Sequence, residues 1–424
     1  MLKLPDPAPA TYVHLARWLR DGDRILVGQG SGEPAVLMRL LAAAASERAR
    51  LTVIIGATLG PLGGTEDGLT FESCGALGTA AQVPETALTI LPLHYAQFIA
   101  RIVDGRLPCD VVCVQLSAPD DQGRVFLGMG DLHLIDAARR ARVVCAEINP
   151  HTPRMSGTQW PDDVPVHVAV TAAGAPLAPL LGEATAEDRA IAAHVAGLVP
   201  DRAVLQLGIG RLPDTVARAL KGHRDLGLHS GTLTDGVAAL IQVGALTNAA
   251  KEIDAGLSVA GVIFGGPDCL NHVRLDPALE ARPTGYTHAA ATLARLSRFH
   301  AINSAIEVDL TGHINAESAG GRRVGGTGGQ VDFTRGAQGS AGGRAIVAMP
   351  ATARAGAVSR IVPRVSHVTI ARTDADTVVT EWGVAELAGC PLDERARRMI
   401  DIAAPQFREG LSRSWHDEGR ARHG

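Results

Sequence analysis

The chain has 424 residues, a formal net charge of −4 and a composition that is 46% hydrophobic and 20% charged, with 48 glycines. This length predicts two domains, since a domain holds roughly 150 residues, and the hydrophobic content excludes a disordered chain. The weakly acidic balance excludes nucleic acid as the main partner, because proteins that bind nucleic acid carry a basic patch. The N-terminus has no long apolar segment and no run of about 18 apolar residues occurs, so we expect a cytoplasmic protein without a membrane partner.

Short apolar runs alternate with amphipathic stretches along the first half. The strand-like runs are "DRILVGQG" (23–30), "LTVIIGAT" (51–58), "CDVVCVQLS" (109–117) and "RVVCAEINP" (142–150). A helix-like stretch, "EPAVLMRLLAAAASERA" (33–49), separates the first two runs, and "TAEDRAIAAHVAGLV" (185–199) precedes the second half. This alternation predicts a mainly parallel sheet with helices on both faces.

The six cysteines lie partly inside these apolar runs and form no paired CxxC pattern. Free thiols are therefore expected, and no metal site is predicted. Cys145 is predicted to lie in the core.

The second half opens as the first half does. "ILVGQGSGEP" (25–34) and "LQLGIGRLPD" (205–214) each place an apolar strand before a Gly-x-Gly turn and a proline. "RVVCAEINPHTPRMSG" (142–157) has a counterpart in "RAIVAMPATARAGAVSRIVP" (344–363). Two pairs in the same order predict two tandem, open, mainly parallel α/β halves of related topology, an N-terminal domain of residues 1–190 and a C-terminal domain of residues 191–424.

The stretch "VGGTGGQVDF" (324–333) holds four glycines within five positions. Ordering such a loop costs much chain entropy, so we expect it to need a positive φ or a close approach to a ligand. Its free N–H groups would suit an oxyanion or a phosphate. The alternative is a flexible surface loop, which the strand-like sequel "QVDF" (330–333) disfavours.

Several stretches of the second half resemble successive motifs of the acetyl-CoA hydrolase / 4-hydroxybutyrate CoA-transferase family. They are "LQLGIGRLPD" (205–214), "LGLHSGTLTDGV" (226–237), the glycine loop with its sequel (325–333), "RAIVAMPATARAGAVSRIVP" (344–363) and "TVVTEWGVAELAG" (377–389). "DVVCVQLSAPDDQGRVFLG" (110–128) and "AEINPHTPRMSG" (146–157) resemble its N-terminal motifs. The resemblance implies the class I CoA-transferase fold, with an acyl-CoA between two open α/β halves. It also implies a small carboxylic acid as a further partner, and a homo-oligomer.

The resemblance implies that coenzyme A contacts the "GIGRL" turn and the glycine loop. Arg354 stands where family members often have lysine, and an arginine can hold a phosphate with two hydrogen bonds. The alternative for Arg354 is a solvated surface charge. The residues expected to bind coenzyme A are Gly208, Ile209, Gly210, Arg211, Leu212, Gly325, Gly326, Gly328, Gly329, Gln330 and Arg354.

In the family a glutamate attacks the thioester carbonyl and then carries coenzyme A as a glutamyl thioester. That glutamate lies in an "HTE" or "HSE" turn, whereas the corresponding residues here are His229, Ser230 and Gly231. The position of the nucleophile is therefore Gly231, which has no side chain. In an extended segment Ser230 and Thr232 would point away from the side that Gly231 faces. For His229 we expect a structural hydrogen bond, and the alternative is a lone base.

Three other carboxylates are candidates for a general base that activates water, namely Glu33, Glu147 and Glu307. For each, the alternative is a charge at a helix terminus or a salt bridge. The sequence thus predicts an enzyme that acts on an acyl-CoA without a covalent intermediate, by hydrolysis, decarboxylation or C–C chemistry. Two alternatives stay open: a true CoA-transferase or hydrolase with a relocated carboxylate, and a non-catalytic acyl-CoA-binding protein or subunit.

Overall fold

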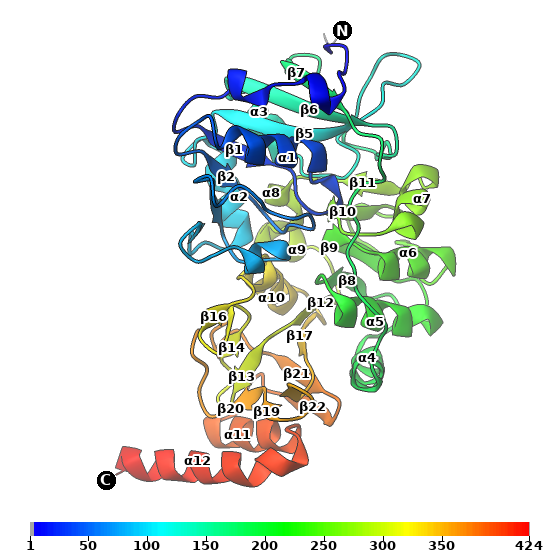
Figure 1. Cartoon of the computed structure of the whole chain (residues 1–424). Coiled ribbons are helices and arrows are strands. Elements are labelled where there is room, and N and C mark those ends of the chain that lie inside the picture. Colours follow the sequence, from blue (N-terminus) through cyan, green and yellow to red (C-terminus); the bar gives the residue numbers. More distant parts are fainter. Residues whose placement is uncertain (1–3, 424) are drawn as a thin grey trace. The chain divides into compact units, whose positions relative to one another are not determined.

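The computed structural model describes residues 4–423, and the chain divides into two compact units (Figure 1). Unit 1 consists of Met1–Leu180, Ser230–Asp235 and Leu257–Thr287, and unit 2 consists of Leu181–His229, Gly236–Gly256 and His288–Gly424. The predicted domain boundary at residue 190 stays a prediction.

Unit 1 contains a parallel sheet of seven strands in the order β4-β3-β2-β1-β5-β6-β7 (Figure 1). The strands are β1 (Arg24–Val27), β2 (Thr52–Ile54), β3 (Thr70–Ser73), β4 (Leu88–Ile90), β5 (Val111–Ser117), β6 (Val143–Asn149) and β7 (Val168–Thr171). The same unit holds a second pair of parallel strands, β10 (Ser258–Ile263) and β11 (Leu279–Ala281), with helices α7 (Pro267–Leu275) and α8 (Thr284–Thr287).

Both faces of the seven-stranded sheet are buried, as expected for parallel strands. Ile25 and Val27 of β1 pack in one core cluster with helix α1 (Ala35–Ala44), whereas Leu26 packs in another with α2 (Tyr95–Val103) and α3 (His133–Ala138). Every residue of β5 and β6 is buried, and Cys145 is 0% exposed in the core, as predicted.

The sheet of unit 2 is built from a second set of mainly parallel strands. Strand β8 (Val204–Leu207) pairs with the first residues of β9 (Gly227–Leu233) on one side and with β12 (Phe299–Ser304) on the other. The sheet continues from β12 through β17 (Arg344–Ala348) and β21 (Thr377–Thr380), and β22 (Gly383–Glu386) closes it as an antiparallel edge. The residues of β9 are divided between the two units.

The helices of unit 2 are α4 (Ala186–Leu198), α5 (Arg211–Ala219), α6 (Asp235–Gln242, from Gly236 on), α9 (Ala290–Leu293), α10 (Gln330–Gly339), α11 (Leu392–Asp401) and α12 (Pro405–His423). Met399 of α11 and Leu411 of α12 pack in one apolar cluster beside the sheet. Among residues 4–423, no helix combines the length and the apolar content that crossing a bilayer requires.

The two sheets share one topology, which confirms the prediction of two mainly parallel halves of related topology. In each, the first strand lies inside the sheet, the next strand in sequence pairs on one side, and a later strand (β5 or β12) pairs on the other. The repeated motifs also match, because β6 lies two strands from β1 and β17 lies two strands from β8. Ligands of open α/β sheets bind beyond the carboxyl ends of the strands where this order reverses.

The prediction of a strand at "QVDF" (330–333) is wrong. Helix α10 begins at Gln330, directly after the glycines, and it buries Phe333, Thr334 and Ala337 along one face. This spacing of three and four residues is that of a helix. Four residues are too few to separate a helical period from a strand period, so the sequence pattern was ambiguous there.

Gly130 is a position where unit 1 requires glycine, and it allows a first prediction. Its φ is +90° and an added Cβ would overlap the carbonyl oxygen of Gly261, whereas Gly68, with φ +89°, has no atom within 4 Å of an added Cβ. Gly68→Ala should therefore lower the free energy of unfolding by only about 1 kcal/mol, the cost of the backbone conformation. Gly130→Ala should lower it by about 3 kcal/mol or more, because the backbone must also move.

Urea unfolding of the two variants and the wild type measures this difference. Equal losses in the two variants would contradict the close packing of Gly130 against Gly261.

Candidate functional site

The turn after β8 holds five of the residues predicted to bind coenzyme A, 208–212. Gly208 donates from its N–H to the carbonyl oxygen of Ile302 (2.9 Å), and an added Cβ there would lie 3.0 Å from Oδ1 of Asn303. Ile209 and Gly210 are half-buried and lead into helix α5. Gly208 thus lies at the carboxyl ends of β8 and β12, where the strand order of this sheet reverses.

The side chains of Arg211 and Leu212 already have partners within unit 2. Nε of Arg211 donates to Oδ2 of Asp188 (2.6 Å), which also closes the capping box of α4 with Thr185. Leu212 is buried in the core. The N–H groups at the start of α5 are the part of this turn that suits an anion, because the first turn of a helix presents N–H donors without intrahelical acceptors.

The glycine loop, residues 325–329, leads into the N-terminus of α10. Gly325 donates to the carbonyl oxygen of Glu317 (3.1 Å), and an added Cβ there would overlap the carbonyl oxygen of Ala316. Gly326 and Gly328 are half-buried in the same loop. The loop therefore follows a close backbone path and is not a slack linker.

The first residue of α10 connects this loop to strand β12. Nε2 of Gln330 donates to the carbonyl oxygen of Ser304 (3.3 Å), one residue beyond the Asn303 that Gly208 approaches. At the other side of the loop, an added Cβ on Gly329 would overlap the ring of His288. Two of the predicted binding segments thus meet at the carboxyl end of β12.

His288 lies beside the glycine loop, and the sequence did not single it out. The ring centroid of His288 lies 4.3 Å from that of Phe333, and His229 meets Phe299 edge to face at 6.4 Å. Burial, with a smaller contribution from His229, lowers the pKa of His288 to about 3. His288 is therefore neutral at physiological pH.

Arg354 lies at the tip of a short hairpin formed by β18 (Thr352–Ala353) and β19 (Val358–Ser359). Its side chain is exposed, and within residues 4–423 it has neither a hydrogen bond nor an ion pair.

Glu307 begins strand β13 (Glu307–Asp309), just after β12. Its Oε2 accepts from Nδ2 of Asn315 (3.2 Å). Arg360 donates from Nε to the carbonyl oxygen of Ile306 (2.7 Å); burial lowers the pKa of Arg360 and the charge of Glu307 opposes that effect. Glu307 thus has an amide and a cationic partner within its own unit.

Glu147 of β6 lies in unit 1 against the start of α1. Its carboxylate is 2% exposed and accepts from the N–H groups of Val36 (2.7 Å) and Leu37 (3.3 Å). Burial raises the pKa of Glu147 to about 7, although these two hydrogen bonds oppose the rise.

Glu33 follows the short helical turn Gly30–Gly32 in the same unit. Its Oε2 accepts from the N–H groups of Leu59 (2.8 Å) and Gly60 (3.2 Å), whereas its buried Oε1 has no hydrogen-bond partner among residues 4–423. Burial raises the pKa of Glu33, and its charge in turn raises that of Glu147. Burial thus favours the protonated form of both carboxyl groups.

Gly231 lies on strand β9, in the part that belongs to unit 1. An added Cβ on Gly261 of β10 would lie 2.8 Å from the carbonyl oxygen of Gly231, so the two backbones are in close contact. The neighbouring Ser230 is 0% exposed, and its Oγ accepts from the N–H of Thr232 (3.2 Å). The extended backbone agrees with Ser230 and Thr232 pointing away from the face of Gly231.

A buried polar group that the sequence did not predict lies near Gly261. Asp131 accepts at Oδ2 from the N–H of Gln29 (2.9 Å) and at Oδ1 from its Nε2 (2.8 Å), and Nε2 also donates to the hydroxyl of Tyr95. The N–H of Asp131 donates to the carbonyl oxygen of Gly261 (3.1 Å). Burial raises the pKa of Asp131 to about 7. The "GQG" turn draws attention to Gln29 in the sequence. Its partners Asp131 and Tyr95 come from distant segments, so no local pattern predicts them.

Comparisons with known proteins agree across most of the chain. Residues 10–171 match the acetyl-CoA hydrolase/transferase N-terminal domain, and residues 265–415 match the corresponding C-terminal domain. A 4-hydroxybutyrate coenzyme A transferase of Clostridium kluyveri is 38% identical over 331 residues, which covers 76% of this chain and 75% of the relative. A succinyl-CoA:cyclohexane-1-carboxylate CoA transferase of Geobacter metallireducens is 31% identical over 412 residues, which covers 94% of this chain and 93% of the relative. The crystal structure of RipA from Yersinia pestis matches with a TM-score of 0.90 at 30% identity over 96% of each chain.

The raised pKa of Glu147 predicts a pH dependence of stability. Between pH 4.5, its usual pKa, and about 7, the folded protein keeps a proton that the unfolded chain has lost. The free energy of unfolding therefore falls as the pH rises through this window. The glutamine of Glu147→Gln cannot ionise but keeps an oxygen for the N–H groups of Val36 and Leu37. As the pH rises through this window, the free energy of unfolding of the variant should therefore increase relative to that of the wild type by on the order of 2–3 kcal/mol.

Urea unfolding at about pH 5 and about pH 8 measures this change. Glu409→Gln, whose side chain is 82% exposed on α12, is the control and should follow the wild type. Parallel pH profiles for the wild type and Glu147→Gln would rule out the raised pKa.

Proposed function

Because the chain belongs to the acetyl-CoA hydrolase/transferase family, whose members act on coenzyme A thioesters, we propose that it binds an acyl-CoA and acts on it without a glutamyl-CoA intermediate. The observation that carries this proposal is Gly231. The residue has no side chain, and its neighbour Ser230 is fully buried. A covalent intermediate at this position has no atom on which to form.

Binding of the coenzyme part is proposed for unit 2. Helices α5 and α10 have nine and ten residues, and their N-termini follow Gly208 and the glycine loop, which both approach β12. Helix N-termini and exposed N–H groups favour phosphate and oxyanions. The same kind of donor would stabilise the negative oxygen that forms when a thioester carbonyl is attacked.

Hydrolysis is the reaction that the carboxyl groups of unit 1 support best. In this step a carboxylate removes a proton from water, and the oxygen of that water forms a bond to the thioester carbon. The C–S bond then breaks, the proton returns to the sulfur, and the products are a free acid and coenzyme A. Glu33 is the preferred base, because its buried Oε1 has no hydrogen-bond partner in the described chain, and Glu147 is the second choice.

The unpartnered Oε1 of Glu33 also supports a second candidate function. In that case Glu33 would itself attack the thioester, and the protein would be a CoA-transferase or hydrolase with a relocated carboxylate. The trapping experiment below separates the two candidates.

The wild-type protein, incubated with acetyl-CoA and then with hydroxylamine, should give no glutamyl hydroxamate by mass spectrometry of its peptides, while coenzyme A is released. Gly231→Glu should gain the hydroxamate, since the substitution places a carboxylate on the extended strand β9 at the proposed position of the nucleophile. Gly231→Gln, which has similar size and no nucleophile, is the matched control and should stay unlabelled.

A hydroxamate on Glu33 of the wild-type protein would favour the relocated carboxylate instead. Binding of acetyl-CoA without any release of coenzyme A would favour a non-catalytic binding protein.

The glycine loop yields a prediction about binding alone. Gly325→Ala should weaken the affinity for acetyl-CoA about tenfold or more, because its Cβ meets the backbone of Ala316 and displaces the loop. Gly339→Ala is the control at the far end of α10, where the nearest atom, Cβ of Ala294, lies at 4.0 Å. Calorimetric titration compares the two variants, and unchanged affinity in Gly325→Ala would remove the loop from the binding site.

A further inference from the structure

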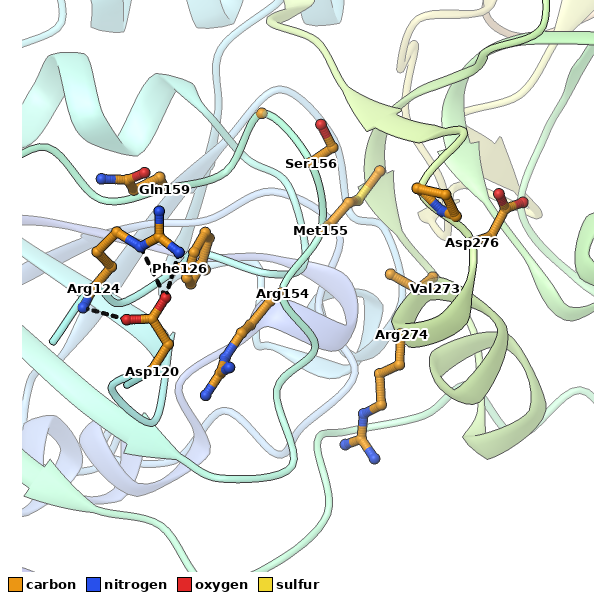
Figure 2. A pocket seen from close by; sticks show the side chains of 12 residues that line it. Asp120, Arg124, Phe126, Arg154, Met155, Ser156, Gln159, Val273, Arg274 and Asp276 are labelled. Carbon is orange, nitrogen blue, oxygen red and sulfur yellow. Dashed lines mark hydrogen bonds and ion pairs between the residues drawn. The ribbon is translucent and has the colours of Figure 1, made fainter. Parts of the chain in front are cut away.

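Unit 1 carries a pocket of about 780 Å³ that the proposed reaction does not use (Figure 2). Its walls come from the two N-terminal motifs, 110–128 and 146–157, and from the end of helix α7 with the residues that follow. A volume of this size fits a ligand much larger than a single inorganic anion.

Two arginines in this pocket lack an acidic partner. Nη2 of Arg154 donates to the carbonyl oxygen of Pro119 (3.3 Å), and Nη2 of Arg274 donates to that of His151. In the part of the chain that the structure describes, neither guanidinium forms an ion pair, and both side chains are exposed. Figure 2 shows them on two different walls of the pocket, Arg154 on the motif 146–157 and Arg274 on α7.

Each of the two carboxylates in the pocket already has hydrogen-bond partners. Asp120 accepts from Nε of Arg124 (2.8 Å), and this hydrogen bond lowers the pKa of Asp120 (Figure 2). Asp276 is bonded to Nε2 of His272 (3.1 Å) and accepts from the N–H of Ala278 (2.8 Å). The positive charges of Arg154 and Arg274 therefore remain for a ligand.

The pocket also offers an apolar surface between its charged groups. Met155 and Val273 are buried residues that line it, and Phe126 lies 5.9 Å below the guanidinium of Arg124. Aromatic rings and guanidinium planes are surfaces on which a planar base can stack.

We propose that this pocket binds a nucleotide, with Arg154 and Arg274 holding its phosphate groups and the guanidinium of Arg124 and the ring of Phe126 contacting its base. Guanidinium groups match phosphate oxygens with paired hydrogen bonds, and the volume has room for a nucleoside diphosphate. The nucleotide is a free nucleoside diphosphate, since the coenzyme part of an acyl-CoA is assigned to unit 2 under the proposed function. This inference does not depend on how the thioester reacts.

Calorimetric titrations of the full chain with ADP, coenzyme A and adenosine test the proposal. ADP should bind the wild-type protein, and adenosine, which has no phosphate, should bind far more weakly. The Arg154→Gln/Arg274→Gln variant should lose affinity for ADP by roughly tenfold to a hundredfold for each guanidinium. Replacing both arginines by lysine keeps the charge and should cause a smaller loss. Arg17→Gln, an exposed arginine of unit 1 outside the pocket, should bind as the wild type does.

The source of the nucleotide follows from the same titrations. Loss of ADP binding in the double glutamine variant with unchanged coenzyme A binding supports a free nucleotide, whereas loss of both would overturn this assignment in favour of the nucleotide end of coenzyme A. If ADP binds the double glutamine variant as well as it binds the wild type, or if it does not bind the wild type, the proposal is wrong.

Discussion

Close backbone packing around Gly261 is the constraint on which the chemistry of unit 1 depends. An added Cβ on Gly130 would overlap the carbonyl oxygen of Gly261, and one on Gly261 would lie 2.8 Å from the carbonyl oxygen of Gly231. Strand β10 is therefore held between the loop that carries Asp131 and strand β9, which carries Gly231. Gly231 itself has no side chain. Under our proposal, chemistry on a thioester therefore uses water or a carboxylate from elsewhere.

Buried carboxyl groups make such chemistry feasible near neutral pH. Burial raises the pKa of Glu147 and of Asp131 to about 7, and it also raises that of Glu33. Desolvation disfavours the charged form of these carboxyl groups, whereas the N–H groups that donate to Glu33 and Glu147 partly stabilise that form. Such groups lower the stability of the folded state at neutral pH, and their presence is typical of functional sites. Among them, Glu33 has a buried Oε1 without a hydrogen-bond partner in residues 4–423.

The sequence predicted the two related parallel sheets because it repeats an apolar strand and a Gly-x-Gly turn at β1 and β8. It did not predict that Gly208 and Gln330 both approach the end of β12, because these residues are far apart in the chain. It failed at 330–333, where four residues could not separate a helix from a strand. The pair of Gln29 and Asp131 was missed, because its members are 102 positions apart and no local pattern links them.

The central claim is that acyl-CoA reacts here without a covalent bond to the protein, and isotope exchange tests it most directly. A glutamyl-CoA intermediate releases the free acid, so a labelled acid that re-enters the site becomes labelled acyl-CoA. With acetyl-CoA and carbon-14 acetate, the account predicts release of coenzyme A and no label in the remaining acetyl-CoA. Transfer of carbon-14 into acetyl-CoA by the wild-type protein would contradict it.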